Sequence, residues 1–286
     1  MRIMTGKTTR WLYGAAFAVS VLFFGYVLFP EDRVKDHMLI SWAEIFPELD
    51  LSIQSLAPSL PLSAKMKGVQ VRLANGFGFD IPFISVGYNI LSSLGSMRSY
   101  SFKADGYDGK ADGTFALTKK APARNTADIH LSGIRMEKIE PVQKITNGLF
   151  SGLLSGEITH DSGKGKDPTF LNLVLSDCKM PVKLAFLDLG VMEFKDVLMD
   201  AALTGQNFEI RKCTLKGVQA DGDFAGQIAF HEDLNRSRLN LSGTINLHHE
   251  FLKTLPQNQA AGNLMTRNGI RFTISGTFEQ PKFSLR

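Results

Sequence analysis

The chain has 286 residues, of which 44% are hydrophobic and 21% are charged, so it is globular rather than disordered. Three of its 32 basic residues, Arg2, Lys7 and Arg10, precede an apolar segment, and no acidic residue occurs before Glu31. Removing these three leaves 29 basic residues against 28 acidic ones, so the remainder is almost neutral. A nucleic-acid-binding domain of this size should carry a basic patch or stripe, and the absence of such a run argues against nucleic acid as a partner.

An apolar segment over residues 11–29 predicts a transmembrane anchor. It contains nineteen residues without a charge. As a helix it would span roughly 29 Å, close to the ~30 Å hydrocarbon thickness of a bilayer. Aromatic residues near its two ends suit the membrane interface. The side chains expected to contact lipid are Trp11, Tyr13, Phe17, Phe23, Phe24, Tyr26 and Phe29.

The charges that flank this segment predict its orientation. Basic residues stay cytoplasmic, so residues 1–10 are expected to form a cytoplasmic tail, with the later residues exported across the membrane. A cleaved signal peptide is the alternative. Its apolar core would be shorter and would end at small residues, whereas this segment ends in Val27-Leu28-Phe29-Pro30. A buried helix of a soluble protein fits less well, because the segment is apolar on every face.

Residues 30–48 are predicted to form a membrane-proximal helix, because Val34 and Met38 begin an apolar stripe at helical spacing. The apolar period then changes from helical to two residues, which is typical of a half-buried strand. Residues 49–286 are therefore expected to form one periplasmic, mainly β domain with a few helices.

The alternation of apolar and polar residues is clearest over residues 239–247 and 270–278. Such alternation predicts a curved, largely antiparallel sheet with one face covered. Two helical patterns interrupt the strands, at residues 139–154 and 248–255.

A unit of the form apolar-x-Gly-x-apolar recurs along the expected strands, with its glycine at an apolar-face position. Glycine weakens a strand unless it has a local purpose. It can allow a bend or bulge, which is the usual reason, or it can leave room above the face for a helix or a ligand. The five strand glycines are Gly113, Gly156, Gly226, Gly243 and Gly276.

Residues 89–117 read NILSSLGSMRSYSFKADGYDGKADGTFAL and resemble the repeated element of AsmA-type periplasmic proteins. There a short apolar turn precedes a strand, a glycine-containing turn and a strand that opens with Gly-x-apolar. Residues 274–285 resemble the closing strand of the same group. Within that group, one N-terminal anchor followed by one modest β-rich domain is similar to type II secretion system protein N. The segment PSLPLS over residues 58–63, before Gly68, and residues 217–230 also resemble that branch.

The resemblance implies a non-catalytic, inner-membrane-anchored accessory component of the type II secretion system, with other secretion subunits as partners. The alternative is AsmA-like lipid binding or transfer between the envelope membranes, with phospholipid as the partner. A curved sheet with an apolar face could hold an acyl chain. In the competing arrangement, the helices at 139–154 and 248–255 fill that face.

The sequence predicts no catalytic site, no cofactor and no metal. Gly6-Lys7-Thr8 lacks the preceding strand and glycine of a P-loop, and the adjacent residues His248 and His249 point in different directions.

Cys178 and Cys213 are the two cysteines. A disulfide between them would need Cα atoms within ~7 Å, and the alternative is two free buried thiols.

Overall fold

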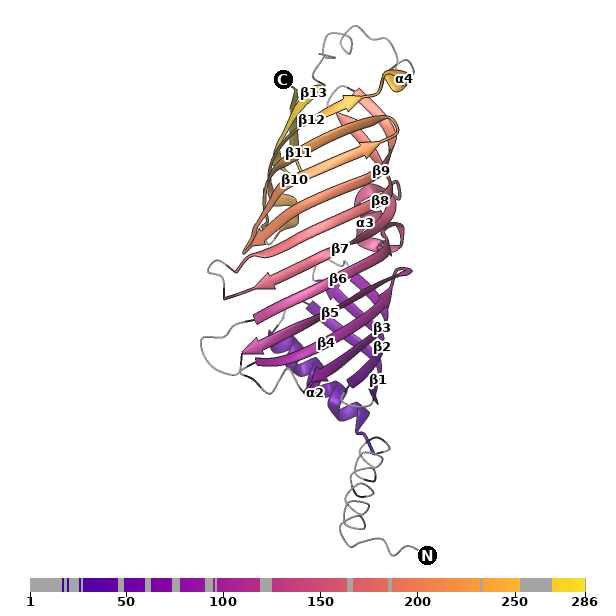
Figure 1. Ribbon diagram of the computed structural model, residues 1–286, viewed down its shortest axis with the longest axis vertical. Coiled ribbons are helices and arrows are strands. Elements are labelled where there is room, and N and C mark those ends of the chain that lie inside the picture. The colour runs from indigo at the N-terminus through magenta and orange to yellow at the C-terminus, as the bar shows by residue number, and fades with distance from the viewer. Residues whose placement is uncertain are drawn as a thin grey trace, which may run out of the picture.

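The computed structural model describes residues 17, 20, 26, 28–45, 49–59, 63–73, 78–90, 95, 97–118, 125–163, 167–184, 187–231, 233–252 and 269–285. Within these residues the protein is mainly β, with a few short helices, and its strands form one antiparallel sheet of 14 strands (Figure 1). Each strand pairs with its neighbours in the sequence, so the sheet is a meander from β1 to β14. The coarse prediction of a mainly β, antiparallel fold is therefore confirmed.

The strands are long and regular. Their bounds are β1 (Leu49–Ser59), β2 (Ser63–Leu73), β3 (Gly78–Asn89), β4 (Met97–Gly106), β5 (Gly109–Thr118), β6 (Asn125–Arg135), β7 (Ser151–Asp161), β8 (Thr169–Leu184), β9 (Leu187–Thr204), β10 (Asn207–Gly217), β11 (Ala220–Ala229), β12 (Arg238–Leu247), β13 (Ile270–Thr277) and β14 (Pro281–Leu285). The two clearest sequence patterns correspond to β12 and β13.

The sheet is curled rather than flat. Open sheets with more than ~10 strands rarely stay unrolled, because the twist of each strand accumulates across the sheet. In Figure 1 the strands cross the long axis of the molecule, with β1 near one end and β13 near the other. At ~4.8 Å per strand, the sheet extends about 60 Å along this axis.

Helices lie at three places along the sheet. They are α2 (Glu31–Ile45), α3 (Glu140–Thr146) with the 3-10 turn η2 (Met136–Lys138) before it, and α4 (His249–Leu252); a further 3-10 turn is η3 (Leu234–Arg236). Helix α2 packs Val34, Met38 and Leu39 against apolar residues of β1–β3. The prediction of a helix within residues 30–48 is confirmed.

The helix predicted over residues 139–154 is wrong in its second half. Helix α3 ends at Thr146, where Asn147 takes a left-handed conformation with φ of 53°, and Gly148 follows with φ of 73°. These residues end the helix because left-handed backbone cannot continue it. Strand β7 starts at Ser151. The pattern at 248–255 gives only α4, and residues 253–255 lie outside the described residues.

Most of the predicted anchor lies outside the described residues, as do Arg2, Lys7, Arg10, Trp11, Tyr13, Phe23 and Phe24. Phe17 and Tyr26 are helical and exposed. Phe29 packs against the cluster that contains Ile53 and Leu56, so this side chain contacts the sheet. Within the described residues, no helix combines the length and the apolar character needed to cross a bilayer.

The first edge of the sheet carries a capped backbone donor. The backbone N–H of Leu56 donates to Oε1 of Glu31 at 2.7 Å, and the Leu56 side chain is 1% exposed. We expect Glu31→Ala to lower the free energy of unfolding by about 1–3 kcal/mol, because an N–H on a buried strand loses a charged acceptor. Urea unfolding monitored by circular dichroism measures this change. Asp32→Ala removes an exposed acid from the same turn and should change stability by less than about 0.5 kcal/mol.

Candidate functional site

One face of the sheet is apolar from its first strand to its last. Direct cross-strand partners lie on the same face, so the register can be followed from strand to strand. A single row crosses all 14 strands and contains only aliphatic, phenylalanine, proline or glycine residues: Pro58, Ala64, Val86, Phe102, Gly113, Ile129, Ile158, Leu171, Ala201, Ile210, Gly226, Leu241, Ile274 and Phe283. We call the face that contains this row the apolar face.

The opposite face is polar. The neighbouring row, one residue away along each strand, runs from β2 to β10 through Lys65, Ser85, Lys103, Asp112, His130, Glu157, Asn172, Asp200 and Lys212. The sheet therefore has one wetted face and one apolar face. The apolar face lies on the concave side, where the segment around α3 packs (Figure 1).

Two clusters cover parts of the apolar face. The first lies under α2 and contains Ile53, Leu56, Met66 and Val69. The second is centred on Met192 and Phe194, which are 0% and 2% exposed; Met136, Phe150 and Phe251 pack on it from the segments of η2, α3 and α4. Among the described residues, the helical segments thus fill the face at these two places.

Between the two clusters the apolar face is only half-buried. We call this part the open stretch, and it comprises Tyr100 and Phe102 of β4, Phe115 and Leu117 of β5, and Ile129 and Leu131 of β6. None of these residues belongs to either cluster among the described residues, and Leu117 is 41% exposed. Contiguous exposed apolar surface in a soluble domain marks a place where another apolar molecule binds.

A row of three neighbouring aromatic rings, which we call the aromatic ladder, runs from β3 into the open stretch. Tyr88, Tyr100 and Phe115 are direct register partners on β3, β4 and β5. The Tyr88 and Tyr100 rings are 5.4 Å apart between centroids, and the Tyr100 and Phe115 rings stack at 4.9 Å with 13° between their planes. Tyr100 and Phe115 are stacked nearly parallel, whereas Tyr88 is tilted by 57° from Tyr100, and the three rings together add aromatic surface to the apolar face.

Charges along one long rim of the sheet are paired with one another. At the rim where η2 and α3 lie, which we call the α3 rim, Asp108 contacts Lys138 Nζ at 2.7 Å and Arg135 Nε at 3.3 Å. These ion pairs lower the pKa of the Asp108 carboxyl, chiefly through the hydrogen bond from Lys138. Arg72 pairs with Asp80 at 3.0 Å on the same rim. The α3 rim is therefore braced by its own charge pairs.

The five strand glycines all lie on the apolar face, and the backbone of a neighbouring segment comes close to each of them. A Cβ on Gly156 would lie 2.2 Å from the carbonyl oxygen of Asn172, and one on Gly226 would lie 2.2 Å from that of Asn240. Gly113, Gly243 and Gly276 likewise have a neighbouring backbone oxygen within 2.1–2.5 Å of this position. The glycines therefore let adjacent backbones approach closely.

Of the two alternatives for Cys178 and Cys213, the structure has two free, buried thiols and no disulfide. Cys178 lies on β8 and Cys213 on β10, with β9 between them. Two strand spacings amount to ~9.6 Å, which exceeds the reach of a disulfide.

Burial raises the pKa of each thiol to about 11. At pH 8 only about one thiol in a thousand would be ionised, and the thiolate is the reactive form. We expect iodoacetamide to leave both cysteines unmodified in the folded protein and to modify both in urea, as read by intact mass. Rapid modification of either cysteine without denaturant would contradict the buried arrangement.

His248, rejected as a metal ligand from the sequence, instead fastens the end of β12 to the β10–β11 turn. Its Nδ1 lies 2.9 Å from the carbonyl oxygen of Val218, and its Nε2 lies 3.0 Å from Oδ2 of Asp221. Both partners are acceptors, so only the imidazolium can donate to both at once. The hydrogen bond with Asp221 is the main cause that raises the pKa of His248 above 6.5, and the same pairing lowers the pKa of Asp221.

A pKa raised by folding gives a stabilisation that is complete below the unfolded value of 6.5 and is lost as pH rises through the higher folded value. We therefore expect the His248 ring protons to titrate above 6.5 in an NMR experiment, with Asp221→Asn lowering that pKa. Lys216, which also faces Asp221, should partly offset the effect of the carboxylate. A His248 titration unchanged by Asp221→Asn would contradict the pairing.

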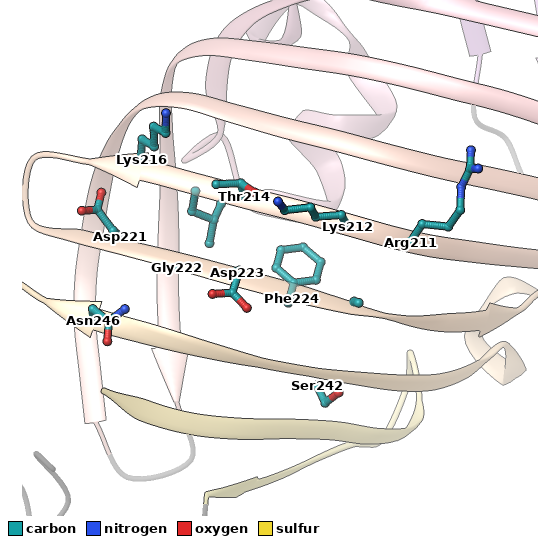
Figure 2. A pocket seen from close by; sticks show the side chains of 12 residues that line it. Arg211, Lys212, Thr214, Lys216, Asp221, Gly222, Asp223, Phe224, Ser242 and Asn246 are labelled. Atoms are coloured by element: carbon teal, nitrogen blue, oxygen red, sulfur yellow. The ribbon is translucent and has the colours of Figure 1, made fainter. Parts of the chain in front are cut away.

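A hollow of about 740 Å³ lies beside the bulge of β10 (Figure 2). Charges of both signs line it, including Lys212, Lys216, Asp221 and Asp223. Arg211 at its edge already pairs with Asp200 at 2.7 Å, and Asp221 pairs with His248. No single charge predominates among the described lining residues, so the hollow indicates no particular ligand.

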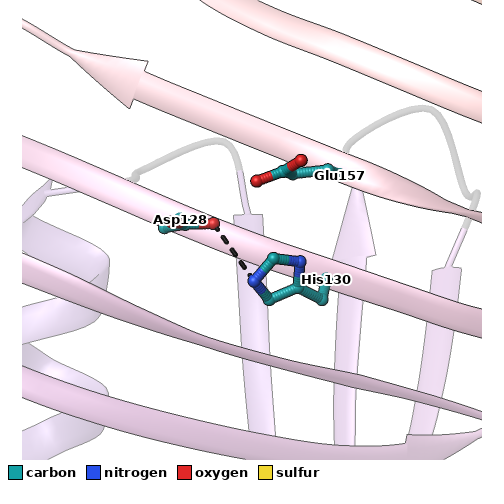
Figure 3. A group of neighbouring side chains, drawn as sticks. All are labelled: Asp128, His130 and Glu157. Atoms are coloured by element: carbon teal, nitrogen blue, oxygen red, sulfur yellow. Dashed lines mark ion pairs between the residues drawn. The ribbon is translucent and has the colours of Figure 1, made fainter.

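Asp128, His130 and Glu157 form an exposed group on the polar face, with their ligand atoms within 4.8 Å of one another (Figure 3). His130 Nε2 lies 3.4 Å from Asp128 Oδ1, and His130 is the direct partner of Glu157 across β6 and β7. Three solvated side chains of this kind are common as surface ion pairs, and no buried ligand completes a metal site among the described residues.

Comparison of the chain with protein-family models, curated proteins and solved structures gives no match. The inference of function therefore rests on the apolar face and its rims.

Proposed function

We propose that this protein binds lipid acyl chains on the apolar face of its curved sheet, as an AsmA-like carrier between the envelope membranes. One observation supports this most strongly: an uninterrupted apolar row crosses all 14 strands and is half-buried through the open stretch. An enzyme or a simple scaffold of this size would be expected to bury such a face. An acyl chain can cover it without hydrogen bonds, which the apolar side chains could not supply.

The dimensions of the sheet suit this role. The open stretch spans β4 to β6 and offers ~20 Å along each strand, which exceeds the ~15 Å depth of one bilayer leaflet. In this proposal residues 11–29 anchor the protein in the inner membrane, and the sheet extends into the periplasm from that anchor. No catalytic step is required of it.

Native mass spectrometry of the full chain, extracted in mild detergent, tests lipid binding. We expect wild-type protein to retain lipid of diacyl mass. Phe115→Asp should release most of it, because a carboxylate enters the open stretch. Thr114→Asp, on the opposite face of the same strand, should retain it. Far-UV circular dichroism confirms that both variants fold, and wild-type protein free of lipid would reject the proposal.

A second candidate is an accessory role in type II secretion, and the free edge of the sheet favours it. Strand β14 has a partner only in β13 among the described strands, so its outer edge can accept a strand from another subunit. At the other edge, Glu31 caps the Leu56 amide. In-cell crosslinking from Ser284 of β14 should recover another secretion subunit. Recovery of none would rule out this candidate without affecting the lipid proposal.

A further inference from the structure

One cation stands on the apolar face. Arg98 precedes Tyr100 by two residues on β4 and is the direct partner of Leu117, so it shares the face of the open stretch. Among the regularly paired apolar-face positions of the described strands, it is the one position occupied by Lys, Arg, Asp or Glu. A charged side chain at an apolar-face position is unfavourable unless it interacts with water or with an opposite charge, so Arg98 calls for an explanation.

Arg98 lies near the start of β4, at the end of this strand that is farther from the α3 rim. Strand β4 begins at Met97 and ends at Gly106 beside the β4–β5 turn, which belongs to the α3 rim. On the α3 rim, Arg72, Arg135 and Lys138 all contact carboxylates. Arg98 is exposed and has no ion pair with a described residue. Its charge is therefore available to an anion that approaches the open stretch.

From Arg98 towards the α3 rim, the apolar face of β4 is long enough to hold a lipid tail. From Arg98 to Ala104 the same face presents Tyr100 and Phe102, over six residues or ~20 Å of strand. One leaflet of a bilayer is ~15 Å deep, half of the ~30 Å core. A tail that runs along β4 over Tyr100 and Phe102 would therefore place its head group beside Arg98.

We propose that Arg98 binds the phosphate of an anionic phospholipid whose acyl chains lie along the open stretch. This inference rests on the proposed lipid-binding function and assigns the ligand and its orientation. The head group lies beside Arg98, and the tails point towards the α3 rim. A guanidinium suits this task because its planar fork donates two parallel hydrogen bonds to a phosphate, whereas an ammonium acts as a point charge. Because Arg98 lies at the end of β4 away from the α3 rim, its position sets the direction in which the lipid lies.

The test compares binding of phosphatidylglycerol and phosphatidylcholine, supplied separately in vesicles to the full chain, with fatty acid as a third probe. We expect wild-type protein to prefer phosphatidylglycerol, Arg98→Gln to bind it about 10-fold more weakly, and Arg98→Lys to fall between them. Arg238→Gln removes an exposed arginine from the polar face of β12 and should bind like wild type.

The possible outcomes separate the two proposals. If wild-type protein binds none of the three probes, the lipid-binding function itself fails. If it binds both phospholipids equally and Arg98→Gln does the same, lipid binding stands and the head-group site is overturned. If Arg98→Gln weakens the binding of fatty acid alone, the site recognises a carboxylate, and the assignment to phosphate is wrong.

Discussion

Replacing Gly156 or Gly226 by alanine should strongly destabilise the sheet. Each has φ of 150°, and an added Cβ would lie 2.2 Å from a carbonyl oxygen of the neighbouring strand. The oxygen belongs to paired backbone and cannot move without disturbing the hydrogen bonds between the strands. We expect the free energy of unfolding to fall by about 2–4 kcal/mol, measured by urea denaturation.

Gly106→Ala is the matched control for these two variants. Gly106 also lies in a strand, but its added Cβ would meet Pro82 Cδ at 3.6 Å, an ordinary contact. Its stability should stay within about 1 kcal/mol of wild type. If Gly156→Ala and Gly106→Ala had equal stability, the close approach of backbones at the glycine bends would be refuted.

Phe194→Ala should cost about 3–5 kcal/mol of unfolding free energy. Phe194 is 2% exposed at the centre of the second cluster, and Met136, Phe150 and Phe251 bring the helical segments onto that cluster. The ring also lies over Gly217, where an added Cβ would be 2.9 Å from Phe194 Cδ1. Removal of the ring leaves a cavity that the surrounding strands cannot close, because their register fixes their spacing.

Val191→Ala, on the same strand, is the control for Phe194→Ala. Val191 is 45% exposed, so its truncation should cost less than about 1 kcal/mol. A cooperative unfolding curve with a midpoint like that of wild type for Phe194→Ala would mean that the second cluster does not hold the sheet together.

The sequence predicted the nature of the fold because strand alternation is a local signal. Strands β12 and β13 have clear two-residue periods, and the glycine units marked apolar-face positions correctly. The prediction failed where two patterns compete. The apolar spacing of residues 139–154 fits a helix, and only the left-handed residues Asn147 and Gly148 divide it between α3 and β7. Strand β9, whose pairings with β8 and β10 contain register shifts, shows no regular period over its 18 residues.

The candidate site could be predicted only in part. Alternation indicates that Phe102 and Phe115 share an apolar face, but their register on adjacent strands decides that they line one continuous row. The same register brings Asp128, His130 and Glu157 together and separates Cys178 from Cys213. In the sequence alone, nothing distinguishes Arg98 from other polar residues of the strands. It becomes distinctive only when its pairing with Leu117 places it among apolar neighbours.

The central claim is that lipid occupies the apolar face and not the polar one. A photo-reactive benzoylphenylalanine placed in living cells at Phe102, and separately at the next residue Lys103, tests it most directly, because the two side chains lie on opposite faces of β4. We predict a lipid adduct of the protein at position 102 and none at position 103, by mass spectrometry of the purified chain. Adducts at both positions, or at neither, would contradict the account.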